Sequence, residues 1–302
     1  MSETAQLDTG TPALIGAGCG IGAAALFGAS APFSKLLLVH IGPILLASLL
    51  YLGAALALGL LKITKWRRKE REARLRGTDF LTLGAITILG GIAGPLLMLY
   101  GLERISALAG SLILNLEAPF TVLIAICAFR EYLGAREVLA MAAILLGVIL
   151  LGWAPGAFHA DPIGAGAIAA ACLCWGIDNN LSQRLSLRDP AVIANIKALG
   201  AGLTTLALAY IIGAPAPRFG LVLAALILGA FCYGMSIYLD IWALRILGAA
   251  REAAYFASAP FLGAIISLAI FPEVPRASEW IAAALMALGV ALLMREKHAH
   301  LH

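Results

Sequence analysis

The sequence predicts an all-α polytopic membrane protein, and three observations support this class. Apolar residues make up 62% of the 302 residues and charged residues only 13%, while the mean hydropathy is +0.95. Soluble domains carry about 45–50% apolar and about 25% charged residues, so this chain has too few charges to cover a soluble surface. The apolar content excludes disorder, and five cysteines in 302 residues exclude a disulfide-based fold.

Apolar runs of about 20 residues, the length that crosses a bilayer as a helix, divide the chain into ten predicted spans. The runs are continuous rather than alternating, which predicts helices because lipid offers no partner to the polar groups of an open strand. The predicted ranges are 13–38, 41–61, 80–101, 105–128, 133–153, 162–183, 190–212, 220–243, 252–271 and 277–294.

The connections between these ranges are short and contain turn residues, as in Ile41-Gly42-Pro43 and Gly213-Ala214-Pro215. Short connections predict that neighbouring helices run antiparallel. The first apolar run is too long for the core of a signal peptide and has no cleavage context, so we expect it to be a retained span.

The distribution of basic residues predicts the orientation. The connection 62–76 holds eight Lys and Arg, and with the other connections on its side the total is 16, against four on the opposite side. The positive-inside rule then places both termini in the cytoplasm. The basic segment 62–79 is best explained as a determinant of topology attracted to anionic lipid, the alternative being a nucleic-acid patch, and no nucleic-acid partner is expected.

An internal duplication is visible in two pairs of segments. Residues 16–38 align with 164–186 at an offset of 148, so that Phe27-Gly28 matches Trp175-Gly176. A second match, at an offset of 141–142, pairs Pro119 with Pro260, Glu131 with Glu273, and Gly147-Val148 with Gly289-Val290.

The duplication predicts two repeats of five spans each, at 13–156 and 157–294, flanked by cytoplasmic tails at 1–12 and 295–302. An odd number of spans per repeat places the two halves in opposite orientations. Such inverted repeats are common in secondary transporters, with the substrate site near the midplane between them. The alternative is a doubled helical bundle without a pathway.

The aligned residues also carry a family resemblance. The segments beginning at Phe27-Gly28 and Trp175-Gly176 resemble the signature that opens each half of the drug/metabolite transporter superfamily, and the Pro, Glu and Gly-Val elements described above complete the pattern in both halves. The chain most resembles the ten-span EamA-type exporters of that superfamily and, more narrowly, bacterial amino-acid exporters of the YddG kind.

The resemblance implies efflux of small metabolites through a central cavity, with no ATP site and no cofactor. Two departures are notable. Phe27 stands where the first copy usually has Trp, and the first span has no acidic residue, so it lacks the carboxylate that four-span multidrug members use for proton exchange.

Ionisable residues inside predicted spans are candidates for the cavity, because each costs about 2.5–3.5 kcal/mol on insertion scales and faces a cavity or a partner. Asn115 and Glu117 precede Pro119, which removes one backbone hydrogen bond from its helix. We expect both to be polar groups of the cavity, the alternative being a Glu117 paired with a basic residue at a helix end. The ionisable candidates are Lys35, Glu117, Asp178, Lys197, Asp240 and Glu252.

Trp175, Asp178 and Asn179 are spaced to share one face of the sixth predicted span. An aromatic wall beside a carboxylate and an amide suits an amphipathic zwitterion; alternatively, these polar residues mark the membrane border. Further candidates for the cavity are Tyr100, Tyr238, Tyr255 and Ser258, and candidate hinges are Pro32, Pro95, Pro119 and Pro260.

Three functional classes remain to be weighed. A membrane-embedded enzyme is disfavoured because the sequence has no intramembrane His-Asp cluster, no Gly-x-Ser-x-Gly elbow and no Walker lysine after a Gly-rich loop. A channel or a scaffold is the alternative, although no repeated filter sequence is present. We therefore expect a carrier with a small-molecule substrate, in which spans 1, 3, 4, 6, 8 and 9 form the cavity and spans 5 and 10 pack outside. The sequence leaves open whether it is a monomer or a homodimer.

Overall fold

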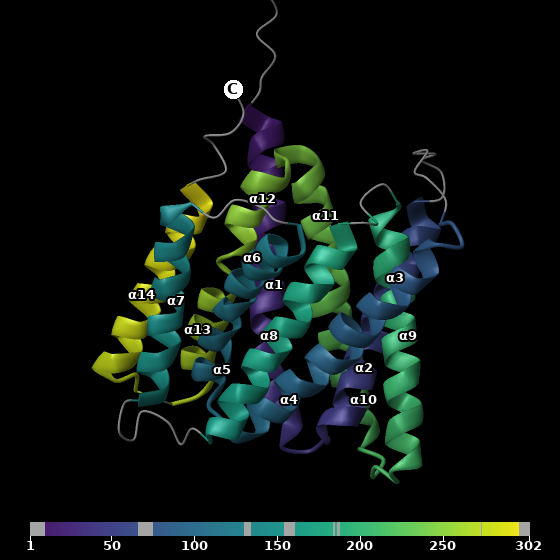
Figure 1. Ribbon diagram of the computed structural model, residues 1–302. Helices are drawn as coiled ribbons and strands as arrows, with labels where there is room; N and C mark the ends of the chain where they lie inside the picture. Colours follow the sequence, from purple (N-terminus) through teal and green to yellow (C-terminus); the bar gives the residue numbers. More distant parts are fainter. Residues whose placement is uncertain are drawn as a thin grey trace, which may run out of the picture.

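The computed structural model describes residues 10–65, 75–129, 134–153, 161–183, 185, 188–272 and 274–295. These residues form an all-α bundle of long, roughly parallel and antiparallel helices (Figure 1). Seven helical segments in the described part of the chain are long and apolar enough to cross a membrane. A helical segment lies in each of the ten predicted ranges, but α7, α8 and α14, defined below, are not among the seven, so ten crossings stay a prediction.

The first half of the chain folds into helices of which two are interrupted in mid-course. A π-helical turn joins α3 to α4, and a 3₁₀ turn joins α5 to α6. The helices are α1 (Gly10–Leu38), α2 (Pro43–Lys65), α3 (Asp79–Ile86), η1 (Thr87–Ala93), α4 (Gly94–Arg104), α5 (Ala107–Ile113), η2 (Leu114–Leu116), α6 (Glu117–Phe129) and α7 (Ala135–Trp153).

The second half has the same order of long and interrupted helices. We call each of the five successive helical units of a half a rod, whether the unit is one helix or is interrupted. A π-helical turn again divides the third rod, and a short break before Ala259 divides the fourth. The helices are α8 (Pro162–Gln183), α9 (Pro190–Ile211), α10 (Phe219–Gly229), η3 (Ala230–Met235), α11 (Ser236–Leu247), α12 (Ala249–Phe256), α13 (Ala259–Ile270) and α14 (Ala277–Arg295).

Contacts between the halves come in matching pairs. The second rods of the two halves, α2 and α9, pack on each other, and so do the fifth rods, α7 and α14, which stand together at one side of the bundle (Figure 1). The first rod of each half packs on the third and fourth rods of the other: α1 contacts α11 and α13, and α8 contacts α4 and α6.

Glycines allow the closest of these contacts. A Cβ on Gly28 of α1 would lie 2.3 Å from the carbonyl oxygen of Ala259, and a Cβ on Gly263 of α13 would lie 2.6 Å from the carbonyl oxygen of Gly28. Backbones can approach this closely only where side chains are absent, which is the usual device of helix packing in membranes. The contact between α1 and α13 therefore depends on both glycines.

The distribution of apolar residues fits a membrane environment. A core of fully buried side chains, including Leu50, Met98 and Ile168, fills the centre. Large apolar side chains are also exposed on the outside, as at Leu81 (85%) and Ile211 (78%). An apolar periphery on this scale is covered by lipid in a multi-pass membrane protein.

Three of the four candidate hinge prolines lie beside an interruption. Pro95 follows the π-helical turn η1, Pro119 follows the 3₁₀ turn η2, and Pro260 follows the break between α12 and α13. Pro32 instead lies inside the continuous helix α1. Whether these positions act as hinges stays a prediction.

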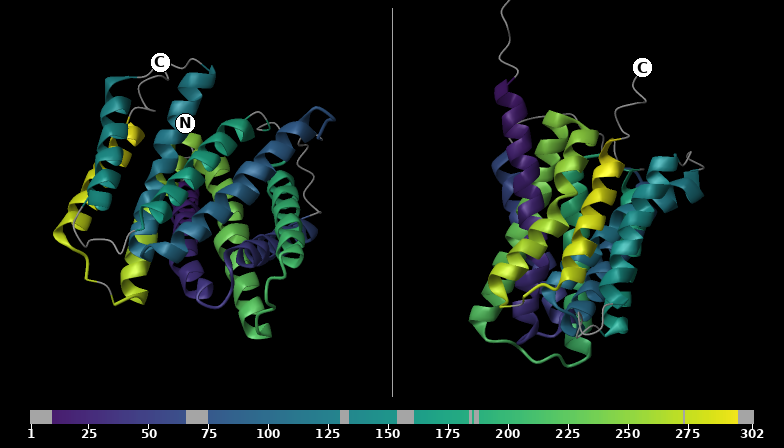
Figure 2. Two further views of the ribbon diagram at one scale, coloured as in Figure 1. Left: turned by 60° about the horizontal axis from the view of Figure 1, so that its bottom comes forward. Right: turned by 90° about the vertical axis from the view of Figure 1, so that its left-hand side faces the viewer.

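α1 begins and α14 ends at the same end of the bundle (Figures 1 and 2). We call this the terminal end, and the other the opposite end. Most of the 1–12 and 295–302 tails, half of the basic connection 62–79, and the repeated Glu131 and Glu273 lie outside the described residues, so their predicted roles stay predictions.

A candidate substrate cavity

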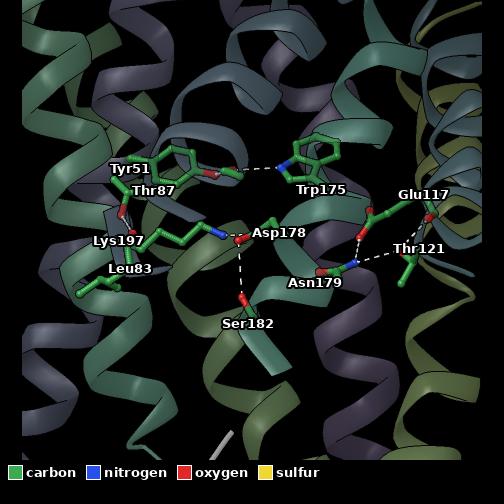
Figure 3. Close-up of polar contacts among 11 residues, drawn as sticks. Tyr51, Leu83, Thr87, Glu117, Thr121, Trp175, Asp178, Asn179, Ser182 and Lys197 are labelled. Atoms are coloured by element: carbon green, nitrogen blue, oxygen red, sulfur yellow. Dashed lines mark hydrogen bonds and ion pairs between the residues drawn. The ribbon is translucent and has the colours of Figure 1, made fainter. Parts of the chain in front are cut away.

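The helix α8 distributes its polar side chains among different neighbours (Figure 3). Trp175 and Asp178 are directed toward the η1 turn and α9, whereas Asn179 is directed toward α6. The three residues were expected to share one face, and the structure separates them. On an α-helix, the third residue after a given one points about 60° to one side of it and the fourth about 40° to the other side. This difference is enough for the side chains to contact different neighbouring helices.

Trp175 is bound to the carbonyl oxygen of Gly90 in η1. In this wide turn the Gly94 N–H bonds to the Leu89 oxygen, and Pro95 has no N–H to offer, so the Gly90 carbonyl loses its regular donor. Trp175 Nε1, at 3.0 Å, and the Tyr51 hydroxyl, at 3.1 Å, donate to it instead. Trp175 is 7% exposed, and it packs as part of the core.

Asp178 forms an ion pair with Lys197 of α9. The Asp178 side chain is 8% exposed and that of Lys197 is 20% exposed, and the Ser182 hydroxyl lies 3.5 Å from the second Asp178 oxygen. The pair fits tightly beside Gly90, where a Cβ would lie 2.2 Å from Asp178 Oδ2. This pair links α8 and α9 to the π-helical turn.

Asn179 belongs to a separate polar network with α6. Its Nδ2 donates to Glu117 Oε1 at 2.8 Å and lies 3.3 Å from Thr121 Oγ1. The Thr121 hydroxyl in turn donates to the Glu117 carbonyl oxygen at 2.8 Å. Glu117 begins α6 directly after the 3₁₀ turn, so the interruption before Pro119 presents its carboxylate beside Asn179.

Around this network lies a cavity of about 1120 Å³. Besides Asn115 and Glu117, residues of α12 and of the start of α7 line it, and these two segments lie at the terminal end of the bundle (Figure 1). Its lining comes from both halves of the chain, namely Phe27, Leu114, Asn115, Glu117, Ala118, Thr121, Val122, Gly134, Glu137, Asn179, Asp240, Glu252, Ala253, Ala254, Phe256, Ala257, Ala259, Pro260, Val290 and Leu293.

Five of the residues predicted as candidates for the cavity line it together, namely Asn115, Glu117, Asn179, Asp240 and Glu252. Trp175 and Asp178 lie behind it in the contacts with η1 and α9. Tyr238, Tyr255 and Ser258 are not among the lining residues, although Ser258 lies between two that are, and its hydroxyl donates to the Tyr255 carbonyl oxygen at 2.6 Å.

Two further candidates lie at the opposite end of the bundle. The Lys35 ammonium at the end of α1 donates to the carbonyl oxygens of Leu102 and Glu103, at the end of α4. The Arg104 guanidinium carbon lies over the Tyr100 ring, 4.5 Å from the centre of that ring. Neither Lys35 nor Tyr100 lines the cavity.

Some lining residues were not expected. The expectation that spans 5 and 10 pack outside is wrong in part, because Glu137 of α7 and Val290 and Leu293 of α14 contribute to the wall. Thr121 was also missed. Its position four residues after Glu117 on one helix face was the available signal.

No group of three or more His, Cys, Asp or Glu that could hold a metal ion occurs among the described residues. What the arrangement offers is a large polar and apolar chamber between helices, a type of site that binds small molecules in helical bundles.

Comparisons with known proteins give a consistent assignment. The family described as "EamA-like transporter family" matches the chain twice, at residues 14–153 and 162–295. A protein of Methanothermobacter thermautotrophicus named "Uncharacterized transporter" is 30% identical over 289 residues, which cover 90% of this chain and 84% of that protein.

A solved crystal structure has a similar fold, with a TM-score of 0.64 and 22% identity over 95% of this chain and 99% of its own. The family match covers nearly the whole chain, and the named relative is a transporter; the narrower likeness to YddG-type exporters stays a prediction. The chain therefore belongs to the EamA-like transporter family, in the drug/metabolite transporter superfamily, and is a multi-pass membrane transporter.

Proposed function

We propose that the protein is a secondary transporter that exports small amphipathic metabolites, such as amino acids or related compounds, by alternating access through the cavity. The observation that carries this proposal is a chamber of about 1120 Å³ that extends from the middle of the bundle to one end and is lined by both halves. A chamber accessible from one side at a time is what such a mechanism requires.

The contacts at the opposite end support a state that is closed on that side. Lys35 holds the end of α4 through backbone carbonyls. Arg104 of α4 pairs with Asp161, just before α8, at 2.5 Å. These contacts tie α1, α4 and the start of α8 together, so we propose that they form an outer gate.

The paired contacts between the halves support two inverted repeats at 13–156 and 157–294. Each first rod packs on the third and fourth rods of the other half, so an exchange of roles between the halves would create a second state with the cavity reaching the opposite end. We propose that both termini are cytoplasmic, in an inner membrane, and that the described state is inward-facing.

The test is counterflow in liposomes that contain the purified protein, screened over amino acids, amines and organic acids. A carrier gives saturable flux that an internal substrate accelerates. Conductance without saturation would instead indicate a channel, and no flux of any compound would indicate a scaffold.

The variants Glu117→Gln and Asn179→Ala should lower kcat/KM by about tenfold, because each removes a charge-assisted hydrogen bond at the cavity wall. Trp175→Ala should also lower flux, through the loss of its bond to Gly90. The matched control is Asp189→Asn, which removes one carboxylate away from the cavity and keeps a residue able to cap α9. Wild-type rates for the Glu117 and Asn179 variants would remove both residues from the site.

A further inference from the structure

Asn180, which follows the cavity residue Asn179 on α8, is an amide side chain buried within the bundle. It is 3% exposed and does not line the cavity. Its Nδ2 donates to the Gly176 carbonyl oxygen of its own helix at 2.8 Å and to the Thr121 carbonyl oxygen of α6 at 2.9 Å. An amide nitrogen carries two hydrogens, so this group uses its whole donor capacity to join α8 to α6.

The two helices are in close contact at this point. A Cβ on Gly176 would lie 3.0 Å from the Thr121 nitrogen and 3.1 Å from the Phe120 carbonyl carbon. Such a contact limits how near the helices can come, but van der Waals contact does not fix their positions along each other. The hydrogen bonds of Asn180 have a preferred direction, so they fix which turn of α6 faces α8.

The amide of Asn180 contributes little to the stability of either helix. Its Oδ1 is buried, and no described residue donates to it, which is unfavourable. The carbonyl oxygens of Gly176 and Thr121 do not depend on Asn180 for a donor, because each lies inside an α-helix and accepts the N–H four residues further along. The effect of Asn180 therefore lies in the register between α8 and α6.

The turn of α6 that Asn180 holds is the one that carries Glu117. Thr121 lies one turn after Glu117, and its hydroxyl donates to the Glu117 carbonyl oxygen. Asn179 donates to Glu117 Oε1 at 2.8 Å and lies near the Thr121 hydroxyl (Figure 3). Consecutive residues of α8 thus contact this turn twice, Asn179 from the cavity and Asn180 from behind its wall. A hydrogen bond is lost beyond about 3.5 Å, so a slip of about 1 Å between the helices would separate Asn179 from Glu117.

The equivalent junction of the other half lacks such a bridge. With the offset of 148 that aligns the halves, Gly176 corresponds to Gly28 of α1. Asn180 corresponds to Pro32, whose side chain has no hydrogen-bond donor. There the close approach of Gly28 and Gly263 brings α1 and α13 together. The amide bridge therefore belongs to the α8–α6 junction, where the polar network of the cavity lies.

We propose that Asn180 is a positioning residue of the transport site. It holds the first turn of α6 against α8, so that Glu117 and Asn179 stay in contact at the cavity wall. The proposal rests on the proposed transport through this cavity, and it adds a residue that acts without contacting the substrate.

The reactivity of the Glu117 carboxyl tests this role without a substrate. Dicyclohexylcarbodiimide, an apolar reagent that adds to accessible carboxyl groups, is applied to the detergent-purified protein, and mass spectrometry gives the labelling rate at Glu117. Asn179→Ala removes the hydrogen bond directly and should raise this rate by about fivefold. Asn180→Leu should raise it by a similar factor, because the carboxyl is then released from Asn179.

The matched control is Asn195→Leu. Asn195 Nδ2 donates to the Ala55 carbonyl oxygen of α2 at 2.8 Å, so this side chain is also an amide bridge between helices of different halves, and it does not line the cavity. The control should leave the labelling rate of Glu117 at the wild-type value. Unchanged labelling in folded Asn180→Leu, or an equal rise in Asn195→Leu, would overturn the proposal.

A double variant separates positioning from a general loosening of the fold. If Asn180 acts through Asn179, Asn180→Leu adds nothing to the labelling rate in the Asn179→Ala variant. A further rise there would show that Asn180 acts independently and would overturn the proposal. Asn180→Ala removes the same donor and replaces Asn180→Leu if the latter has no cooperative melting transition. Failure of both variants to fold would assign Asn180 to stability and would also overturn the proposal.

Counterflow of L-phenylalanine in proteoliposomes connects the position of Glu117 to transport. Asn180→Leu should raise KM by about threefold to tenfold with kcat near the wild-type value, and it should have no further effect in the Glu117→Gln variant. Asn195→Leu should change neither constant, and a loss confined to kcat in Asn180→Leu would overturn the proposal. If the wild type carries no phenylalanine, the proposed export of such amino acids fails, whereas the labelling rates still decide the role of Asn180.

Discussion

Neutralising one partner of the Asp178–Lys197 pair should destabilise the protein far more than neutralising both. The Asp178 side chain is 8% exposed and that of Lys197 is 20% exposed, inside a tightly packed junction of three helices. Removal of one member of a buried pair costs about 3–5 kcal/mol, because an uncompensated charge remains, whereas replacement of both by uncharged groups is often close to neutral. Partial exposure of Lys197 places the expected cost near the lower value, about 3 kcal/mol.

The assay is a double-mutant cycle with Asp178→Asn, Lys197→Met and the double variant. The free energy of unfolding is measured in mixed micelles by titration with SDS, followed by tryptophan fluorescence. Each single variant should lose about 3 kcal/mol and the double variant about 1 kcal/mol or less, so the double variant loses about 5 kcal/mol less than the sum of the single variants, which is the coupling energy of the pair. Additive losses would refute the reasoning, since they would mean that the two charges do not compensate each other within the bundle.

Three further predictions concern packing, capping and charge. Gly28→Ala should lower stability by about 1–3 kcal/mol, because its Cβ would meet a backbone carbonyl of α13 at 2.3 Å. The control Gly18→Ala, which has open space around its Cβ, should leave the melting temperature unchanged. Equal melting temperatures of the two variants would contradict the packing argument. Ser106 accepts the Ala109 N–H at 3.1 Å as the N-cap of α5, so Ser106→Ala should cost about 1 kcal/mol in the SDS titration and Ser106→Asn much less. Hydrogen bonds from Arg104 and from a backbone N–H hold the pKa of Asp161 below its usual 3.8, so its carboxylate contributes stability above that pH and loses the contribution as the pH falls through the lowered pKa. The difference in melting temperature between the wild type and Asp161→Asn should therefore stay constant from pH 8 to pH 5; a difference that fades within that range would show that the carboxylate already takes up its proton there.

The membrane class and the positions of the helices could be predicted from the sequence because both depend on local composition. Each predicted range contains a helical segment, and the turn residues Gly213 and Gly248, with φ of 68° and 80°, lie between helices. These features follow from the length of the apolar runs and from backbone sterics. The number of crossings does not follow in the same way, because helices such as α8 combine membrane length with many polar residues.

The candidate site was predicted in part. Asn115 and Glu117 line the cavity at the interruption that Pro119 marks in the sequence, and their role toward a substrate stays a prediction. The partner of Asp178 could not be predicted, since spacing along α8 does not say which helix packs on each side of it. Trp175 was expected to face the substrate. Its indole instead donates to the Gly90 carbonyl oxygen, which lies on the other side of the helix and lacks a backbone donor because Pro95 has no N–H.

The wide turns at Thr87–Ala93 and Ala230–Met235 also set the register of everything that follows them. Each residue of an α-helix advances the chain by about 100°, so one residue removed from such a turn would rotate the remainder of its rod by that amount. In the first half this rotation would move Arg104 away from Asp161, and in the second it would turn Asp240 out of the chamber. In both turns, therefore, the number of residues matters more than the identity of most of their side chains.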